Sequence, residues 1–136
     1  MLDVFQVDPS QAGPPPEPAN FTGAVRIQSM HKAAGAQSVE ALIVHFPAGA
    51  RTRPHTHPGE QVLHFVRDSG FVHLVGEDEQ RVPEGGVVIV PAGVVHMHGA
   101  TDDGAVVHVA IRAANGPTDW HPDGVPDDWR RWSVDR

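Results

Sequence analysis

Short apolar runs alternate with turn-forming residues along most of this chain, and no long segment carries the apolar period of a helix. The runs favour strands because they are rich in Val, Ile and Phe, while Gly, Pro, Asp and Asn fill the breaks between them. Many short strands separated by turns predict an all-β fold, either a sandwich or a barrel. We expect a buried strand at 87–91, which is β-branched. We expect the other strands at residues 21–28, 38–46, 61–67, 71–76, 94–100 and 105–113.

The 136 residues are enough for one hydrophobic core, so we expect one domain. Residues 1–20 end in "GPPPEPAN", which predicts an extended, proline-rich arm. Residues 21–113 hold the predicted strands and form the barrel. Residues 114–136 form a polar tail with three tryptophans, in which only "DDWRRW" is compatible with a short helix. We expect the tryptophans to pack this tail on the barrel or on a second subunit.

Charge and composition exclude several classes of partner. A net charge of −7 argues against binding to nucleic acid or to an anionic membrane. There is no apolar run of about 18 residues for a membrane span, and the first residues lack a signal-peptide pattern, so we expect a cytoplasmic protein. The absence of cysteine removes disulfides, thiolate ligands and thiol nucleophiles.

Histidines in two short segments have the spacing of metal ligands. His55 and His57 share one face of an extended segment because successive side chains alternate, and Gln61 opens the next strand. His96 follows the "PAG" turn in a separate strand. Three imidazoles and an amide oxygen form a neutral ligand set for one divalent ion, which would be Mn, Fe, Co, Ni, Cu or Zn. The alternative is a set of core histidines bonded to the backbone.

Glu60 competes with Gln61 for the fourth ligand position, because strand alternation allows only one of them to face the metal. The spacing from His57 favours Gln61. With Gln61 the ion keeps its full charge, which favours Lewis-acid chemistry. With Glu60 one charge is cancelled, which is more typical of a redox or oxygen-using centre.

Further polar and apolar residues are candidates for the surroundings of the metal. His98 has the parity of His96, and His108 lies mid-strand, so each is either a general acid or base or a hydrogen-bonded core histidine. Arg53 and Arg112 either bind an anionic substrate or are surface charges. The candidate walls of a substrate pocket, whose alternative role is plain core, are Leu42, Val44, Phe46, Leu63 and Phe65.

The two histidine segments resemble the motifs of the cupin superfamily, G-x5-HxH-x3,4-E-x6-G and G-x5-PxG-x2-H-x3-N. The matching residues are Gly49, His55 and His57 in the first motif and Gly85, Pro91, Gly93 and His96 in the second. Gln61 replaces the acidic ligand, Asp68 the closing glycine and Ala100 the asparagine. The resemblance extends over about residues 21–112 and implies a jelly-roll barrel and a homodimer.

A narrower resemblance is to small single-domain cupins that include manganese-dependent bacterial hydroxynitrile lyases. It rests on the segments "FTGAVRI", "FPAGARTRPHTHP", "VPAGVVHMHGA" and "VVHVAI". It implies that His55, His57, Gln61 and His96 are the ligands, and that His108 lies in the pocket. Met97 replaces an aromatic residue usual in that group, and "VRDSG" replaces its usual strand end, so the pocket need not be the same.

These observations predict a metal-dependent enzyme that transforms a small molecule, by lyase or isomerase chemistry with the metal as Lewis acid. One alternative is an iron or copper dioxygenase. The other is a cupin that binds a small molecule or a metal without turnover, since a fold alone does not determine function.

Overall fold

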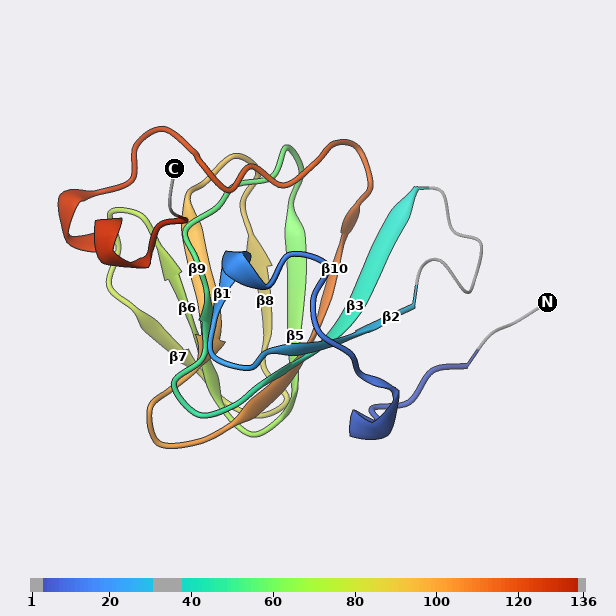
Figure 1. The fold of residues 1–136 in the computed structure, drawn as a ribbon. Coiled ribbons are helices and arrows are strands. Elements are labelled where there is room, and N and C mark those ends of the chain that lie inside the picture. Colours follow the sequence, from blue (N-terminus) through green and yellow to red (C-terminus); the bar gives the residue numbers. More distant parts are fainter. Residues whose placement is uncertain (1–3, 31–37, 135–136) are drawn as a thin grey trace.

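The computed structural model describes residues 4–30 and 38–134, and these form ten strands and three short 3-10 helices (Figure 1). The predicted connection at 31–37, which includes His31, lies outside the described residues. The strands are β1 (Phe21–Thr22), β2 (Arg26–Ser29), β3 (Val39–Phe46), β4 (Arg51–Thr52), β5 (Gln61–Arg67), β6 (Gly70–Leu74), β7 (Gln80–Val82), β8 (Val87–Val90), β9 (His96–Ala100) and β10 (Val106–Ala113). The 3-10 helices are η1 (Pro9–Gln11), η2 (Pro18–Asn20) and η3 (Asp127–Trp132).

The strands form two five-stranded antiparallel sheets with the orders β1-β4-β9-β6-β7 and β2-β3-β10-β5-β8. The two sheets face each other as a jelly-roll barrel, which confirms the predicted all-β fold (Figure 1). None of the described helices is long and apolar enough to cross a bilayer.

The run at 21–28 does not form one strand, because the chain changes sheet within it. Gly23 takes a φ of 78°, and a Cβ there would lie 2.7 Å from the Cβ of Ala50. The chain turns at Gly23, where it passes close to Ala50, and β1 and β2 therefore belong to different sheets. The prediction of a single strand at 21–28 was wrong.

The hydrophobic core fills the space between the sheets. β10 lies between β3 and β5, and its register pairs His108 with Val44 on one side and Phe65 on the other. The fully buried core residues include Phe46, Leu63, Phe65, Val90 and Val106. β5 and β9 begin and β10 ends at the same end of the barrel (Figure 1), and the polar residues Gln61, His96 and Arg112 near this end are buried.

The prediction that 87–91 is a buried strand was wrong. Val90 is fully buried, but Val87 and Ile89 are 60% and 54% exposed. β8 is an edge strand that pairs only with β5, and every second residue faces away from the core. Its β-branched composition suits an edge strand as well as a central one, so the sequence pattern did not distinguish the two.

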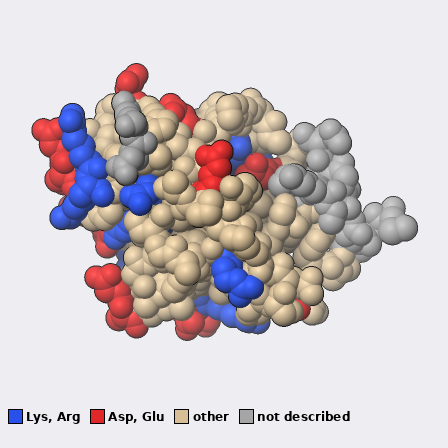
Figure 2. All heavy atoms as spheres, viewed as in Figure 1, with Lys and Arg blue, Asp and Glu red and all other residues tan. Residues whose placement is uncertain are grey.

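The tail after β10 crosses the end of the barrel and then packs on its outer side (Figure 1). The backbones of Thr56 and Asp119 form two hydrogen bonds, of 3.0 and 2.8 Å. The "DDWRRW" segment forms η3, the expected short helix, and buries Trp129 in a second apolar cluster with Phe71, Val95 and Met97. Basic and acidic side chains lie side by side over this part of the tail (Figure 2), where Arg130 Nε is 3.0 Å from Asp127 Oδ1.

Candidate metal centre

The four predicted ligands meet at the end of the barrel that the tail crosses. His55 pairs with His96 through two backbone hydrogen bonds of 3.2 and 3.0 Å, which join the segment after β4 to the start of β9. Gln61 is the first residue of β5, and His57 lies in the connection between β4 and β5. All four side chains are buried. Strand alternation predicted that His55 and His57 share one face, and the pairing of His55 with His96 brings the separate strand β9 beside them.

Hydrogen bonds to the backbone orient the three imidazole rings. The Nδ1 atoms of His55, His96 and His57 lie 2.7, 2.8 and 3.2 Å from the carbonyl oxygens of Arg53, Val94 and Gly59. Donation from Nδ1 leaves the lone pair on Nε2, the atom that then binds a metal. The ring centroids of His55 and His57 lie 4.2 and 4.9 Å from that of His96, so the three rings surround a common space.

Two features of the site show that it fits a cation. The Nε2 atom of His96 is buried and has no hydrogen-bond partner among the described residues. The Nε2 atom of His57 lies 3.2 Å from Oε1 of Gln61, so with its proton on Nδ1 a neutral His57 turns a lone pair toward another acceptor. A cation bound to both atoms would replace this acceptor–acceptor contact with two favourable ones. The donor set, three imidazoles and an amide, suits a first-row divalent metal.

Burial keeps these rings in the neutral form that metals require. Desolvation, reinforced by His96, places the pKa of His55 well below 6.5. Desolvation also lowers the pKa of His96 to about 4 and lowers that of His57, where nearby Arg112 adds to the effect. At neutral pH the site is therefore uncharged and ready to bind a metal without releasing protons.

His98 is also close enough to the site to be a ligand. Donor atoms of His55, His96 and His98 lie within 4.8 Å of one another, which makes a group of three buried histidines that could hold a metal ion. This group and the predicted ligand set share His55 and His96. The predicted set adds His57 and Gln61, whereas the group found in the structure adds His98.

His98 and His108 form a buried pair, with Nδ1 of His98 2.9 Å from Nε2 of His108. The outer nitrogens of the pair, Nε2 of His98 and Nδ1 of His108, have no hydrogen-bond partner within the described part of the chain. The rings of Phe46 and Phe65 lie 5.0 and 5.3 Å from that of His108. Desolvation lowers the pKa of His108 to about 4 and places that of His98, next to His108, well below 6.5. Both rings are therefore neutral, and Nε2 of His98 is free to accept or donate a proton.

A cavity of about 90 Å³ adjoins the histidines, and only some of the predicted pocket residues line it. Leu42, Val44 and Phe46 do so from β3. Leu63 and Phe65 belong to the core instead, because they lie further along the inward face of β5 than Gln61 and pack in the hydrophobic cluster.

The two arginines also differ in their position. Arg112 lines the cavity, but its guanidinium is held by Glu40 at 3.4 Å and by the carbonyl oxygens of Ala113 and Gly116 at 3.2 and 2.9 Å. Arg53 does not line the cavity, because its side chain donates to the carbonyl oxygens of Ala19 and Trp132. Arg53 therefore joins the arm to the tail.

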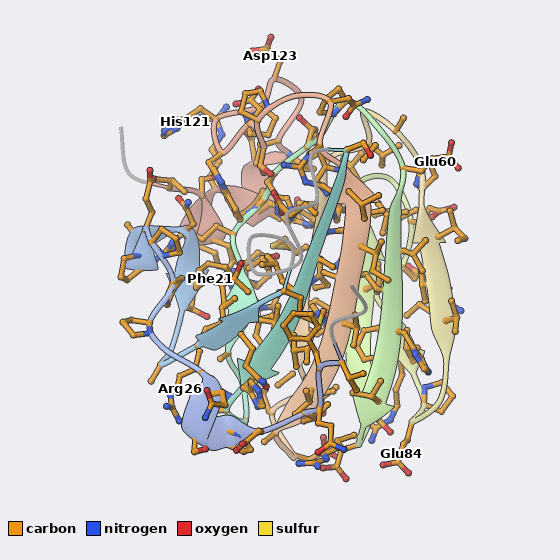
Figure 3. All side chains as sticks on the ribbon, turned by 90° about the vertical axis from the view of Figure 1, so that its right-hand side faces the viewer. Phe21, Arg26, Glu60, Glu84, His121 and Asp123 are labelled. Carbon is orange, nitrogen blue, oxygen red and sulfur yellow. The ribbon has the colours of Figure 1, made fainter. Side chains whose placement is uncertain are left out.

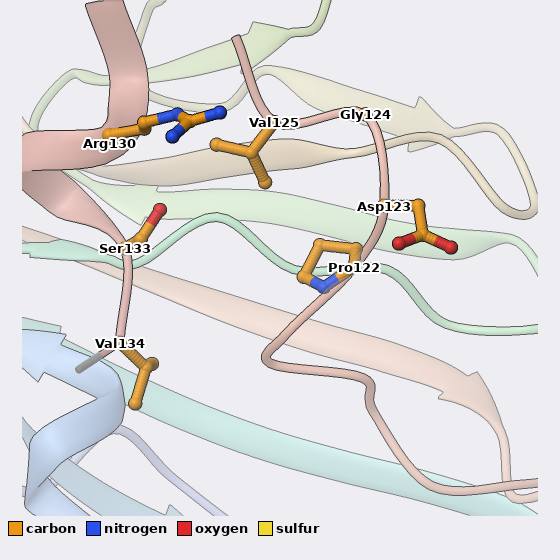
Figure 4. Close-up of a pocket in the computed structure, with 7 residues that line it drawn as sticks. All are labelled: Pro122, Asp123, Gly124, Val125, Arg130, Ser133 and Val134. Atoms are coloured by element: carbon orange, nitrogen blue, oxygen red, sulfur yellow. The ribbon is translucent and has the colours of Figure 1, made fainter. Parts of the chain in front are cut away.

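Phe21, Thr118 and Trp120 also line the cavity, although no sequence pattern marked them as pocket residues. The sequence predicted only that the tail tryptophans pack on the barrel or on a second subunit. A larger hollow of about 420 Å³ lies within the tail itself, between Pro122, Val125 and Arg130 (Figure 4). No histidine lines that hollow, so it lacks the donors of the metal centre.

The structure turns Gln61 inward and Glu60 outward. Gln61 is buried beside His57, whereas Glu60 is exposed at the rim of the barrel (Figure 3). We therefore expect Gln61→Ala to weaken metal binding by about tenfold or more, because an oxygen donor is lost. Competition with a coloured chelator measures this affinity. The matched control Glu60→Gln should leave the affinity unchanged, and an equal loss in both variants would contradict the assignment.

The fold and the histidine cluster define a cupin, and residues 42–112 match the family model described as the cupin domain. The chain belongs to this family. It is 34% identical over 113 residues to an (R)-mandelonitrile lyase from Granulicella tundricola, covering 82% of this chain and 86% of the relative.

Solved structures show the same architecture. A cupin-like protein from Thermotoga maritima MSB8 superposes with a TM-score of 0.76 at 31% identity, covering 98% of this chain and 99% of that one. The polyketide cyclase RemF from Streptomyces resistomycificus superposes with a TM-score of 0.73 at 15% identity, covering 93% and 89%. At that identity the likeness shows the fold alone.

Proposed function

We propose that this cupin is a metal-dependent lyase that cleaves a hydroxynitrile into a carbonyl compound and hydrogen cyanide. The observation that carries the proposal is the cluster of buried, neutral histidines beside a cavity with apolar walls on β3, in which donor atoms of His55, His96 and His98 lie within 4.8 Å of one another. The relative from Granulicella tundricola, named for cleavage of mandelonitrile, supports this choice of reaction.

The ligand set suits this chemistry. A divalent ion held by His55, His57, Gln61 and His96 would keep its full charge and, as a Lewis acid, favour the deprotonated hydroxyl oxygen of the substrate. These four residues are neutral, so they would cancel none of the positive charge of the ion.

We assign the transfer of the proton to His98. Its Nε2 atom accepts the proton of the substrate hydroxyl, the oxygen forms a carbonyl, and the bond to the nitrile carbon breaks. The bonding electrons leave with cyanide, which takes the proton from His98 and departs as hydrogen cyanide. The step is redox-neutral and returns His98 to its neutral form. His108 holds the His98 ring in place through the 2.9 Å contact.

The cavity suits a neutral substrate with a hydrocarbon substituent. Leu42, Val44 and Phe46 provide apolar walls on β3. The charge of Arg112 is balanced by Glu40, and its guanidinium already donates to two carbonyl oxygens. The cavity lining therefore offers no unpaired cation for an anionic substrate.

Cleavage of racemic mandelonitrile tests the proposal. Protein reconstituted with Mn, Fe, Co, Ni, Cu or Zn in turn should release benzaldehyde, detected by its absorbance, and leave one enantiomer in excess on chiral chromatography. His98→Gln should lower kcat by roughly 100-fold or more with metal content unchanged, because the proton acceptor is lost.

The matched control is His64→Gln, at an exposed position of β5 outside the cavity, which should leave kcat unchanged. Lack of cleavage with every metal would overturn the proposal. Substrate-dependent oxygen consumption without cleavage would indicate a dioxygenase instead.

A further inference from the structure

Trp120 in the tail is in direct contact with a candidate metal ligand. Its indole stacks on the imidazole of His55, with ring centroids 4.4 Å apart and planes inclined by 29°. Phe21 of β1 lies against the indole at 5.9 Å, with an angle of 55°. Trp120 is half-buried and lines the cavity.

The backbone beside Trp120 is held against the histidine segment. Asp119 forms its two hydrogen bonds with Thr56, the residue between His55 and His57. The Asp119 side chain accepts a hydrogen bond of 2.9 Å from the backbone N–H of His121, which fixes the turn that follows. His121 and Asp123 lie at the same end of the barrel as Glu60 (Figure 3). The indole is therefore placed by the fold and is not carried on a free tail.

The indole limits the size of the cavity. A volume of about 90 Å³ corresponds to roughly three water molecules at ~30 Å³ each. Leu42 and Val44 of β3 form one wall of the cavity. β3 lies inside its sheet, between β2 and β10. Trp120 is the largest lining side chain that does not come from a strand, so its replacement enlarges the cavity without altering the barrel.

We propose that Trp120 determines substrate size, so that the cavity admits compact neutral hydroxynitriles and rejects those with fused or branched rings. This inference takes the hydroxynitrile substrate from the proposed lyase function. The selection by substituent size is a property of binding and does not depend on the reaction. The aromatic contact with His55 fixes the indole in the position that excludes larger substituents.

Binding of two unreactive neutral alcohols tests the inference separately from turnover. The probes are isobutanol, which is compact, and 2-naphthylmethanol, which carries a fused ring, titrated into zinc-loaded protein and followed by ligand-observed NMR. Trp120→Ala should lower the ratio of Kd for the bulky alcohol to Kd for the compact one by about tenfold or more. Trp120→Phe, which keeps a smaller ring on His55, should give an intermediate ratio.

Trp132→Ala is the matched control, because Trp132 belongs to the same tail and does not line the cavity. Its ratio should equal that of the unaltered protein, and zinc content should be the same in all four proteins. An unchanged ratio in Trp120→Ala, an equal shift in Trp132→Ala, or no binding of either alcohol to any of the proteins would overturn the inference. A shifted ratio without cleavage of mandelonitrile would leave size selection standing and overturn only the proposed reaction.

Discussion

Replacement of His96 by alanine is expected to abolish metal binding, with a loss of affinity of more than about 100-fold. His96 is fully buried, and its ring lies 4.2, 4.9 and 5.7 Å from those of His55, His57 and His98. It belongs to both overlapping ligand sets, so its loss cannot be compensated by a shift from one set to the other. The proposed lyase activity should fall to the background rate because the metal is lost.

Elemental analysis of protein purified without an affinity tag measures this effect. His96→Gln keeps most of the side-chain volume and tests whether the loss is due to the missing imidazole. His64→Ala, at an exposed position on the outer face of β5, should retain full metal content. Metal retained by a folded His96→Ala variant, shown by an unchanged circular dichroism spectrum, would remove His96 from the site.

Acidification is expected to destabilise the metal-free protein by about 4 kcal/mol between pH 7 and pH 5 through two histidines alone. Burial lowers the pKa of His96 and of His108 from 6.5 to about 4, so at pH 5 both rings are neutral in the folded chain. In the unfolded chain the same rings take up protons below pH 6.5. Stability is therefore complete above pH 6.5 and falls progressively as the pH drops toward 4.

Urea unfolding in the presence of a chelator, repeated between pH 7.5 and pH 5 in roughly half-unit steps, checks this slope. His108→Gln should reduce the change by about 2 kcal/mol, the share of one of the two rings, because that ring no longer binds protons differently in the folded and the unfolded chain. His55 and His98, whose pKa values also lie well below 6.5, add to the slope in the same direction. A free energy of unfolding that is flat over this range would contradict the neutral, buried state of these rings.

The histidine site was predictable because strand alternation is a strict rule. The rule predicted that His55 and His57 share one face, and the structure buries both together with His96. The same rule allowed only one of Gln61 and Glu60 to face inward, and the spacing from His57 favoured Gln61, which the structure buries. The fold class followed from the density of short runs and turns.

The sequence predictions were wrong or incomplete where contacts between distant parts of the chain determine the structure. The split between β1 and β2 depends on the close approach of Gly23 to Ala50, which lies far away in sequence. The exposure of Ile89 depends on the edge position of β8, which composition does not reveal. The place of Trp120 over His55 depends on two backbone hydrogen bonds between Asp119 and Thr56, and "TDW" in a polar tail carries no period that predicts them.

The contacts of Arg53 couple the arm and the tail to the histidine segment. Its guanidinium donates to the carbonyl oxygens of Ala19 and Trp132, which lie before and after the barrel in the sequence. The carbonyl oxygen of the same residue lies 2.7 Å from Nδ1 of His55. A displacement of the arm or of the tail is therefore transmitted to the ring of His55 through one residue.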